Sequence, residues 1–69
     1  MKEKLFVSTL DVDGYDLVVV GTSKTANRRA LLQDARKMHK TTEMSVIREM
    51  YLDEIRHAEV EEFGKVIWP

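Results

Sequence analysis

Three aspartates flank a glycine in LDVDGYDLVVV, residues 10–20, and carboxylates near a glycine turn are ligands that Ca²⁺ and other hard cations prefer. A calcium loop of the EF-hand type places acids at positions 1, 3 and 5, glycine at 6 and glutamate at 12. Here the glycine stands at position 4 of the motif, and strand-forming residues resume at once. We therefore interpret Asp13-Gly14 as a turn and Asp11 and Asp16 as solubilising residues at a hairpin tip. Asp11 opposite Asp16 is mildly repulsive, which leaves a weak ion site as an alternative.

Glu54 and His57 have the Glu-x-x-His spacing that di-iron carboxylate proteins use on their helices. Those sites need two such motifs and two further glutamates on four long helices, and this chain contains one copy. We interpret the pair as a solvated helix face that ends in a histidine, a position that the helix dipole favours. His39, near the end of an earlier predicted helix, has the same interpretation. The sequence therefore predicts no metal and no cofactor.

Ser8, Ser23 and Ser45 are the serines that could act as nucleophiles. They are predicted in a strand, a helix cap and a helix, and no Gly-x-Ser-x-Gly elbow, phosphate loop or dinucleotide fingerprint surrounds them. A chain of 69 residues also leaves little room for a concave substrate pocket. We expect no enzymatic activity.

Charge is distributed unevenly along the chain. Six basic residues and one acid lie between Lys24 and Lys40, whereas seven acids and two arginines lie between Glu43 and Glu62. The two segments either neutralise each other across a helical hairpin or a subunit boundary, or the basic one binds phosphates of a nucleic acid. The net charge of −1 and the absence of aromatic residues from the basic run weigh against nucleic acid. The residues of that alternative face are Arg28, Arg29, Arg36, Lys37 and Lys40.

Two strand-like stretches, residues 5–12 and 15–21, flank Asp13-Gly14, which suits a two-residue type I′ turn because both positions need positive φ. The turn sets the cross-strand pairs from Val12 with Tyr15 to Val7 with Val20. Alternation then makes both hairpin faces apolar. One face holds Phe6, Leu10, Val12, Tyr15, Leu17 and Val19, and the other holds Leu5, Val7, Thr9, Val18 and Val20.

Two helices are predicted in the middle of the chain. The first runs from about Lys24, after a Thr22 or Ser23 cap, to about His39. The second follows Thr41-Thr42 and carries an apolar stripe at Met44, Ile47, Tyr51, Ile55 and Ala58. We expect this helix to fray near residues 57–60. Residues 65–68 have strand composition and would pair within the chain or with a neighbouring chain. We predict one α+β domain over residues 1–69, an N-terminal antiparallel β-hairpin followed by two helices with a short C-terminal strand, ββαα(β).

The size of the chain favours self-association. A core of this size supplies only about 3–5 kcal/mol, so disulfides, a metal or oligomerisation usually help. The chain has no cysteine, which excludes disulfides and is compatible with a cytoplasmic location. No apolar run approaches the ~20 residues of a membrane span, and we read no signal peptide. We expect a cytoplasmic homodimer that does not bind membranes.

The apolar residues exceed what the chain can bury alone, and contiguous apolar patches usually mark interaction surfaces. A competing interpretation is that the tail folds back and closes the core. The acidic residues of the second helix would steer the protein toward a basic target. The predicted protein interface consists of Val7, Val18, Val20, Met50, Leu52, Phe63 and Trp68.

The order of features in KLFVSTLDVDGYDLVVVGTSKTANRRALL, followed by AEVEEFGKVIW, resembles that of small hairpin-then-helix proteins often encoded by bacteriophages and mobile elements. The resemblance is one of layout and assigns no site residue. It implies an accessory protein that binds and modulates a host protein. We therefore expect a non-enzymatic protein–protein interaction module, with a small nucleic-acid-binding regulator as the alternative.

Overall fold

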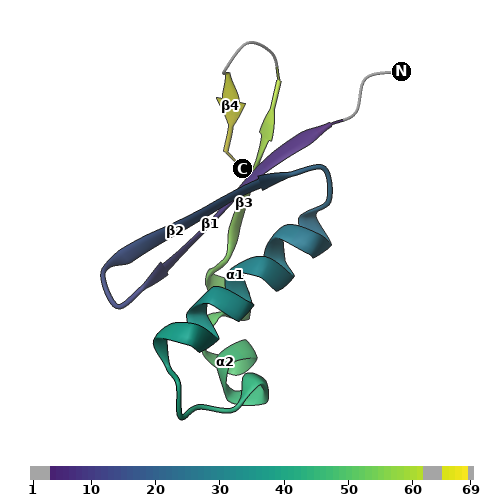
Figure 1. The fold of residues 1–69 in the computed structure, drawn as a ribbon. Coiled ribbons are helices and arrows are strands. Elements are labelled where there is room, and N and C mark those ends of the chain that lie inside the picture. The colour runs from purple at the N-terminus through teal and green to yellow at the C-terminus, as the bar shows by residue number, and fades with distance from the viewer. Residues whose placement is uncertain (1–3, 62–64, 69) are drawn as a thin grey trace.

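The computed structural model describes residues 4–61 and 65–68, which form an α+β fold (Figure 1). A hairpin, two helices and a short C-terminal strand confirm the predicted order, and one further strand follows the second helix. In chain order the elements are β1 (Leu5–Val12), β2 (Tyr15–Gly21), α1 (Lys24–Met38), α2 (Met44–Tyr51), a 3₁₀ helix η1 (Leu52–Glu54), β3 (Arg56–Val60) and β4 (Val66–Ile67).

Strands β1 and β2 pair antiparallel around the predicted two-residue turn. Asp13 and Gly14 have φ angles of 53° and 87°, as a type I′ turn requires at both positions. Asp11 Oδ1 accepts a hydrogen bond from Gly14 N at 2.9 Å. The predicted register is confirmed, and the pairs are Val12–Tyr15, Asp11–Asp16, Leu10–Leu17, Thr9–Val18, Ser8–Val19, Val7–Val20 and Phe6–Gly21.

Helix α1 begins at Lys24 because Ser23 caps it, with Ser23 Oγ accepting a hydrogen bond from Ala26 N at 3.2 Å. It ends at Met38, one residue before the predicted end. Met38, its last residue, is 41% exposed. The buried residues of α1 are Asn27, Leu31, Leu32 and Ala35.

The second helix is shorter than predicted. It ends at Tyr51, η1 follows, and residues 56–60 form β3 instead of further helical turns. β3 pairs with β1 on the side opposite β2. A helix here would leave the peptide groups along that edge of an eight-residue strand without partners, so sheet pairing outweighs the helical spacing of Ile55 and Ala58.

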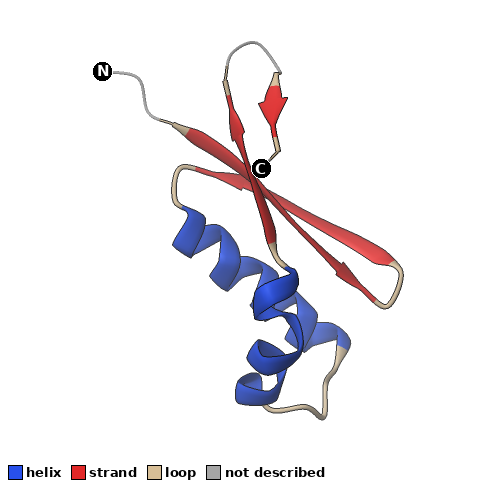
Figure 2. Ribbon diagram, turned by 180° about the vertical axis from the view of Figure 1, so that it is seen from behind, coloured by secondary structure: helices blue, strands red, loops and turns tan. Residues whose placement is uncertain are grey.

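The four strands form one antiparallel sheet in the order β2-β1-β3-β4. The predicted C-terminal strand is β4, and it pairs with β3 rather than with the hairpin. Both helices lie on the same side of the hairpin (Figure 2). In the described part of the chain, no helix has the length and apolarity needed to cross a membrane. The core between helices and sheet consists of Leu10, Val12, Leu31, Leu32, Ala35, Ile47 and Tyr51.

Candidate protein-binding surface

The sheet face turned away from the helices is apolar, and we call it the open face. The hairpin register places odd-numbered residues of β1 and even-numbered residues of β2 on it, as predicted. Strands β3 and β4 extend it, since Val7 lies opposite Ala58 and Val60 lies opposite Val66, although Ala58 itself is buried within one chain. Its most exposed large apolar residues are Leu5, Val18, Val20, Val66 and Trp68, at 42, 60, 58, 38 and 42%. The open face comprises Leu5, Val7, Thr9, Asp11, Asp16, Val18, Val20, Arg56, Ala58, Val60, Val66 and Trp68.

A hollow of about 420 Å³ lies in the open face, where Arg56 and Trp68 meet Thr9, Asp16 and Val18. The guanidinium carbon of Arg56 lies 5.5 Å from the centre of the Trp68 ring, within cation–π range. No ion pair joins Arg56 to Asp16, although both line the hollow. Tryptophan and arginine are enriched among the residues that dominate binding energy at protein interfaces. The hollow can therefore receive an apolar side chain next to a charged partner.

The seven residues predicted for a protein interface do not lie on one common surface. Met50 is 47% exposed, but it lies on α2 rather than on the open face. Leu52 is half-buried and packs against the core, so it does not belong to an exposed surface. Phe63 lies outside the described residues. The open face brings together the other four, Val7, Val18, Val20 and Trp68.

The basic residues of the alternative nucleic-acid face occupy two different positions. Arg29, Arg36, Lys37 and Lys40 are exposed on α1 or just after it. Lys37 Nζ lies 3.8 Å from Asp34 Oδ1, and this exposed pair contributes little to stability. Arg28 is half-buried, and its charge lowers the pKa of His57 in β3.

The acidic residues expected on one helix are divided among several elements. Glu49 lies in α2, Asp53 and Glu54 lie in η1, and Glu59 lies in β3. Glu59 Oε1 is 3.5 Å from Lys4 Nζ. Within residues 4–61 and 65–68, no ion pair joins these acids to the basic residues of α1. Neutralisation between the two helices, one of the interpretations of the uneven charge, is therefore not found there.

A buried polar chain, which the sequence did not predict, links α1 to β1 and β3. Asn27 Nδ2 donates hydrogen bonds to Phe6 O and Ser8 Oγ, both at 3.1 Å. Ser8 Oγ lies 2.5 Å from His57 Nδ1. Because a carbonyl can only accept, Phe6 O fixes which end of the Asn27 amide points toward it. Ser8 accepts from Asn27 and donates its own proton to Nδ1, so we assign His57 as neutral with its proton on Nε2.

His57 is held in this neutral form by its surroundings. Burial lowers its pKa, and the charges of Arg28 and Lys24 lower it further. Ser8 is 0% exposed, and in the described residues no carboxylate bonds to the His57 ring. A nucleophile must reach its substrate, so the Ser8–His57 pair does not form a serine–histidine catalytic site. The pair instead satisfies polar groups between sheet and helix.

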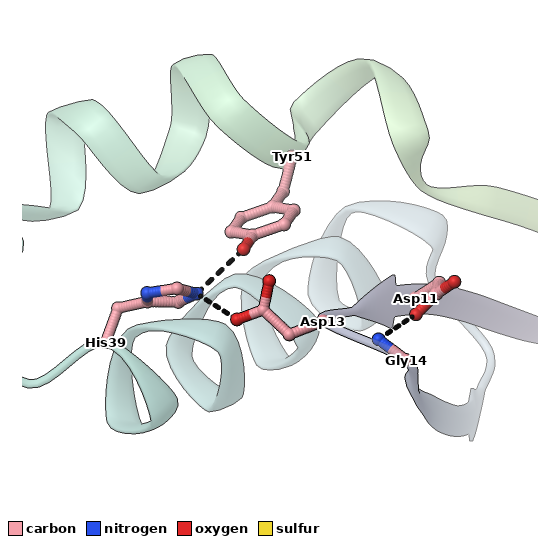
Figure 3. A network of polar contacts seen from close by, with 5 residues as sticks. All are labelled: Asp11, Asp13, Gly14, His39 and Tyr51. Carbon is pink, nitrogen blue, oxygen red and sulfur yellow. Dashed lines mark hydrogen bonds and ion pairs between the residues drawn. The ribbon is translucent and has the colours of Figure 1, made fainter.

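A second polar cluster joins the hairpin tip to both helices (Figure 3). His39, the C-cap of α1, has its Nε2 at 3.1 Å from Asp13 Oδ2 and at 2.8 Å from the hydroxyl of Tyr51. The ring centres of His39 and Tyr51 are 5.8 Å apart. Burial raises the pKa of Tyr51, and the charges of Asp13 and Asp11 raise it further, so the phenol stays protonated at neutral pH. The cluster fixes the turn against the helix ends.

The carboxylates considered for metal binding have other partners. Asp11 accepts from Gly14 N, as turn chemistry predicts, and Asp13 contacts His39. Glu54 lies in η1 and His57 in β3, so the two do not share a helix face, and His57 is not helix-terminal as we interpreted it. Among residues 4–61 and 65–68, no three His, Asp or Glu side chains converge in a way that could hold a metal.

Comparison of the chain with protein-family models, with curated proteins and with solved structures finds no match. No family and no site residue are therefore assigned by similarity. The function is argued below from the open face and from the charged residues of α1.

Proposed function

We propose that the protein is a non-enzymatic protein–protein interaction module that forms a homodimer by packing its open face against that of a second copy. One observation carries the proposal: five large apolar side chains of the open face are between 38 and 60% exposed. Contiguous apolar patches of this kind are uncommon on monomeric proteins and usually mark interaction surfaces. Two aligned sheets packed face to face are a common way to bury such residues.

The small core supports self-association. Eight hydrophobic residues of the described part are buried, and a core of this size supplies about 3–5 kcal/mol. Both helices cover one face of the sheet. On the other face Ala58 is already buried within one chain, whereas Val18 and Val20 remain 60 and 58% exposed, so a second molecule can bury them. A standard interface of about 800 Å² per partner would use about 15% of the chain's 5350 Å² of accessible surface. The open face provides a patch of suitable character for that area.

Charge complementarity favours a second copy over an unrelated partner. A two-fold interface is self-complementary, so a contact from one residue to another occurs twice. Arg56 and Asp16 line the hollow of the open face without pairing within one chain. When two open faces pack around an axis near this hollow, each Arg56 can meet Asp16 of the partner subunit. Both charges gain a partner, and the apolar residues around them are buried.

Molar mass in solution, measured by light scattering, tests this proposal. The wild type is expected at twice the chain mass of 8.0 kDa or above, and Val18→Lys at 8.0 kDa. Burying the exposed 60% of Val18 contributes about 1–2 kcal/mol, and burying an unpaired lysine there costs more. Met50→Lys is the matched control, because Met50 is exposed on α2, and it should keep the wild-type mass. A wild type of 8.0 kDa at every concentration would refute the proposal.

The exposed basic residues of α1 favour nucleic-acid binding as a second candidate function. Arg29, Arg36, Lys37 and Lys40 are exposed and can contact phosphates. Fluorescence anisotropy with a labelled DNA duplex tests this candidate across a salt series. Counterion release predicts that the affinity falls steeply as salt rises, whereas an apolar dimer interface is comparatively insensitive. No anisotropy change at low salt would exclude the second candidate and leave the first unaffected.

The layout resemblance adds a biological context to the interaction module. In that context the protein is a cytoplasmic accessory protein of phage or mobile-element type that binds and modulates a host protein. The host protein would then compete with the second copy for the open face, because both need the same apolar residues.

A further inference from the structure

Strand β2 forms an unprotected edge of the sheet. It stands at the end of the order β2-β1-β3-β4 and pairs on one side only, along all seven of its residues. Soluble proteins blunt such edges with charged side chains, above all lysine, with proline, with a bulge or with a very short strand. β2 has one charged residue, Asp16 beside the turn, and no proline, lysine or bulge, whereas β4 at the opposite edge is two residues long. A long, regular and apolar edge such as β2 favours pairing with another strand.

The peptide groups available for such pairing belong to alternate residues of β2. In a two-residue hairpin the residues next to the turn exchange both hydrogen bonds, and every second pair along the ladder does the same. Counting from Tyr15 in the observed register, the odd-numbered residues of β2 direct their peptide groups toward β1. Asp16, Val18 and Val20 therefore direct theirs outward.

We propose that β2 pairs antiparallel with β2 of a second copy, around a two-fold axis at Val18. Edge pairing joins two face-to-face dimers into a tetramer of two eight-stranded sheets. The number of copies therefore rests on the proposed function, which supplies the face-to-face dimer. Val18 lies opposite Val18 of the partner subunit, and Asp16 lies opposite Val20 of the partner subunit. All outward N–H and C=O groups of the two strands then have partners.

Length and charge select this register. Residues Tyr15–Gly21 are centred on Val18, so this register pairs the whole strand. A shift toward the turn brings Asp16 opposite Asp16 of the partner subunit, and like charges directly opposite each other are destabilising. On the helix side of the sheet, Tyr15 is 68% exposed. It lies opposite Gly21 of the partner subunit, a cross-strand contact in which an aromatic ring compensates for glycine.

Helix α1 leaves room for the second copy. The flank of α1 that carries His39 faces α2, because His39 bonds to Tyr51. Ala26 and Ala30, one turn apart, lie on the side of α1 away from His39, and Ala26 is exposed whereas Ala30 is half-buried. α1 packs on both β1 and β2, so the α1 axes of two edge-paired copies lie about two strand spacings, or ~9.6 Å, apart. Helices pack at about 8–10 Å, so two α1 helices at this spacing do not overlap.

Two substitutions of Val20 separate edge pairing from face packing. Val20→Lys and Val20→Asp both place a charge in the open face, so both should abolish face packing. In the edge pairing, position 20 lies opposite Asp16 of the partner subunit, so lysine is attracted and aspartate is repelled. By light scattering we expect the wild type at four times 8.0 kDa, Val20→Lys at twice and Val20→Asp at once. Circular dichroism verifies that both variants are folded.

The outcomes distinguish failure of the edge pairing from failure of the proposed function. Equal masses for the two variants overturn the edge pairing, because face packing alone does not depend on the sign of the charge. A wild-type dimer with both variants monomeric keeps the proposed function and refutes the edge pairing. A dimer that persists in Val20→Lys but not in Val20→Asp, with no larger wild-type assembly, keeps the edge pairing and refutes face packing. A monomeric wild type refutes both.

Hydrogen exchange of the wild type gives a readout that needs no variant. The outward amides of Asp16, Val18 and Val20 have no partner in a single chain and should exchange fast there. Edge pairing protects them, so their exchange should slow by about tenfold or more and approach that of Leu17 and Val19, which bond to β1. Fast exchange at the three outward amides beside slow exchange at Leu17 and Val19 would overturn the proposal.

Discussion

Ser8→Ala tests the buried polar chain and is expected to lower the free energy of unfolding by about 2–5 kcal/mol. The Ser8 side chain is 0% exposed and bonds to Asn27 Nδ2 and His57 Nδ1. Removing the hydroxyl deletes two hydrogen bonds of about 1 kcal/mol each. It also leaves an N–H of Asn27, itself 3% exposed, without an acceptor, which adds about 1–3 kcal/mol when no water replaces the hydroxyl.

This loss is large for so small a domain. At about 0.05–0.15 kcal/mol per residue, a chain of 69 residues has a total stability of about 3–10 kcal/mol. We expect Ser8→Ala to lower Tm by about 10 °C or more. Urea unfolding followed by circular dichroism measures the difference at a fixed protein concentration, because self-association contributes to apparent stability. Ser45→Ala, at an exposed position of α2, is the control and should change stability by less than about 0.5 kcal/mol. Equal effects of the two substitutions would refute the structural role of the polar chain.

Three further predictions concern the same two polar clusters. Gly21→Ala should destabilise the fold by about 1–3 kcal/mol in urea unfolding, because a Cβ at Gly21 would lie 2.5 Å from Asn27 Oδ1. The pKa of His57 is lowered by folding, so below pH 6.5 the unfolded chain takes up a proton that the folded chain resists. The free energy of unfolding should therefore decline as pH falls below 6.5, and His57→Gln should flatten that decline in urea titrations across this range. Tyr51→Phe removes the hydroxyl that contacts His39 and should cost about 1 kcal/mol, measured by thermal unfolding.

Local signals were sufficient for the first half of the fold. Asp13-Gly14 accepts positive φ at both positions, so the turn set the hairpin register without reference to the rest of the chain. Ser23 defined the start of α1 in the same way, through one side-chain contact with the first turn. Both features depend on residues within four positions of each other, which a single sequence displays directly.

The second half depends on a partner that is distant in the sequence. Residues 56–60 continue a helical spacing, but β1 offers them a free strand edge from residues 5–9. Hydrophobic periodicity cannot weigh that long-range pairing against one more helical turn. Because the sequence did not predict β3, it also did not predict two features of the site. Arg56 lies on the open face and His57 bonds to Ser8 because both residues belong to this strand.

The polar chain has a weak signal in the sequence. Ser8 stands between Phe6 and Leu10 on a strand face that is otherwise apolar, and Asn27 lies one helical turn before Leu31. A polar residue within an apolar stripe is buried only with a hydrogen-bonding partner, so each of the two implied a partner elsewhere. Their identification with each other required the three-dimensional arrangement of β1 and α1.

The same polar chain explains which face of a doubly apolar hairpin becomes the core. A shift of one residue in the pairing register moves every side chain of a strand to the other face of the sheet. Alternation of apolar and polar residues normally prevents such a shift, because only one face is then suitable for burial. Here Leu5, Val7, Val18 and Val20 would also suit a core, so apolarity alone does not choose between the faces. Ser8 does, because its hydroxyl has partners only on the side where α1 and β3 supply an amide and an imidazole. By holding Ser8 inward, Asn27 and His57 also hold the valines of the open face outward, so one set of hydrogen bonds specifies both the core and the surface proposed for self-association.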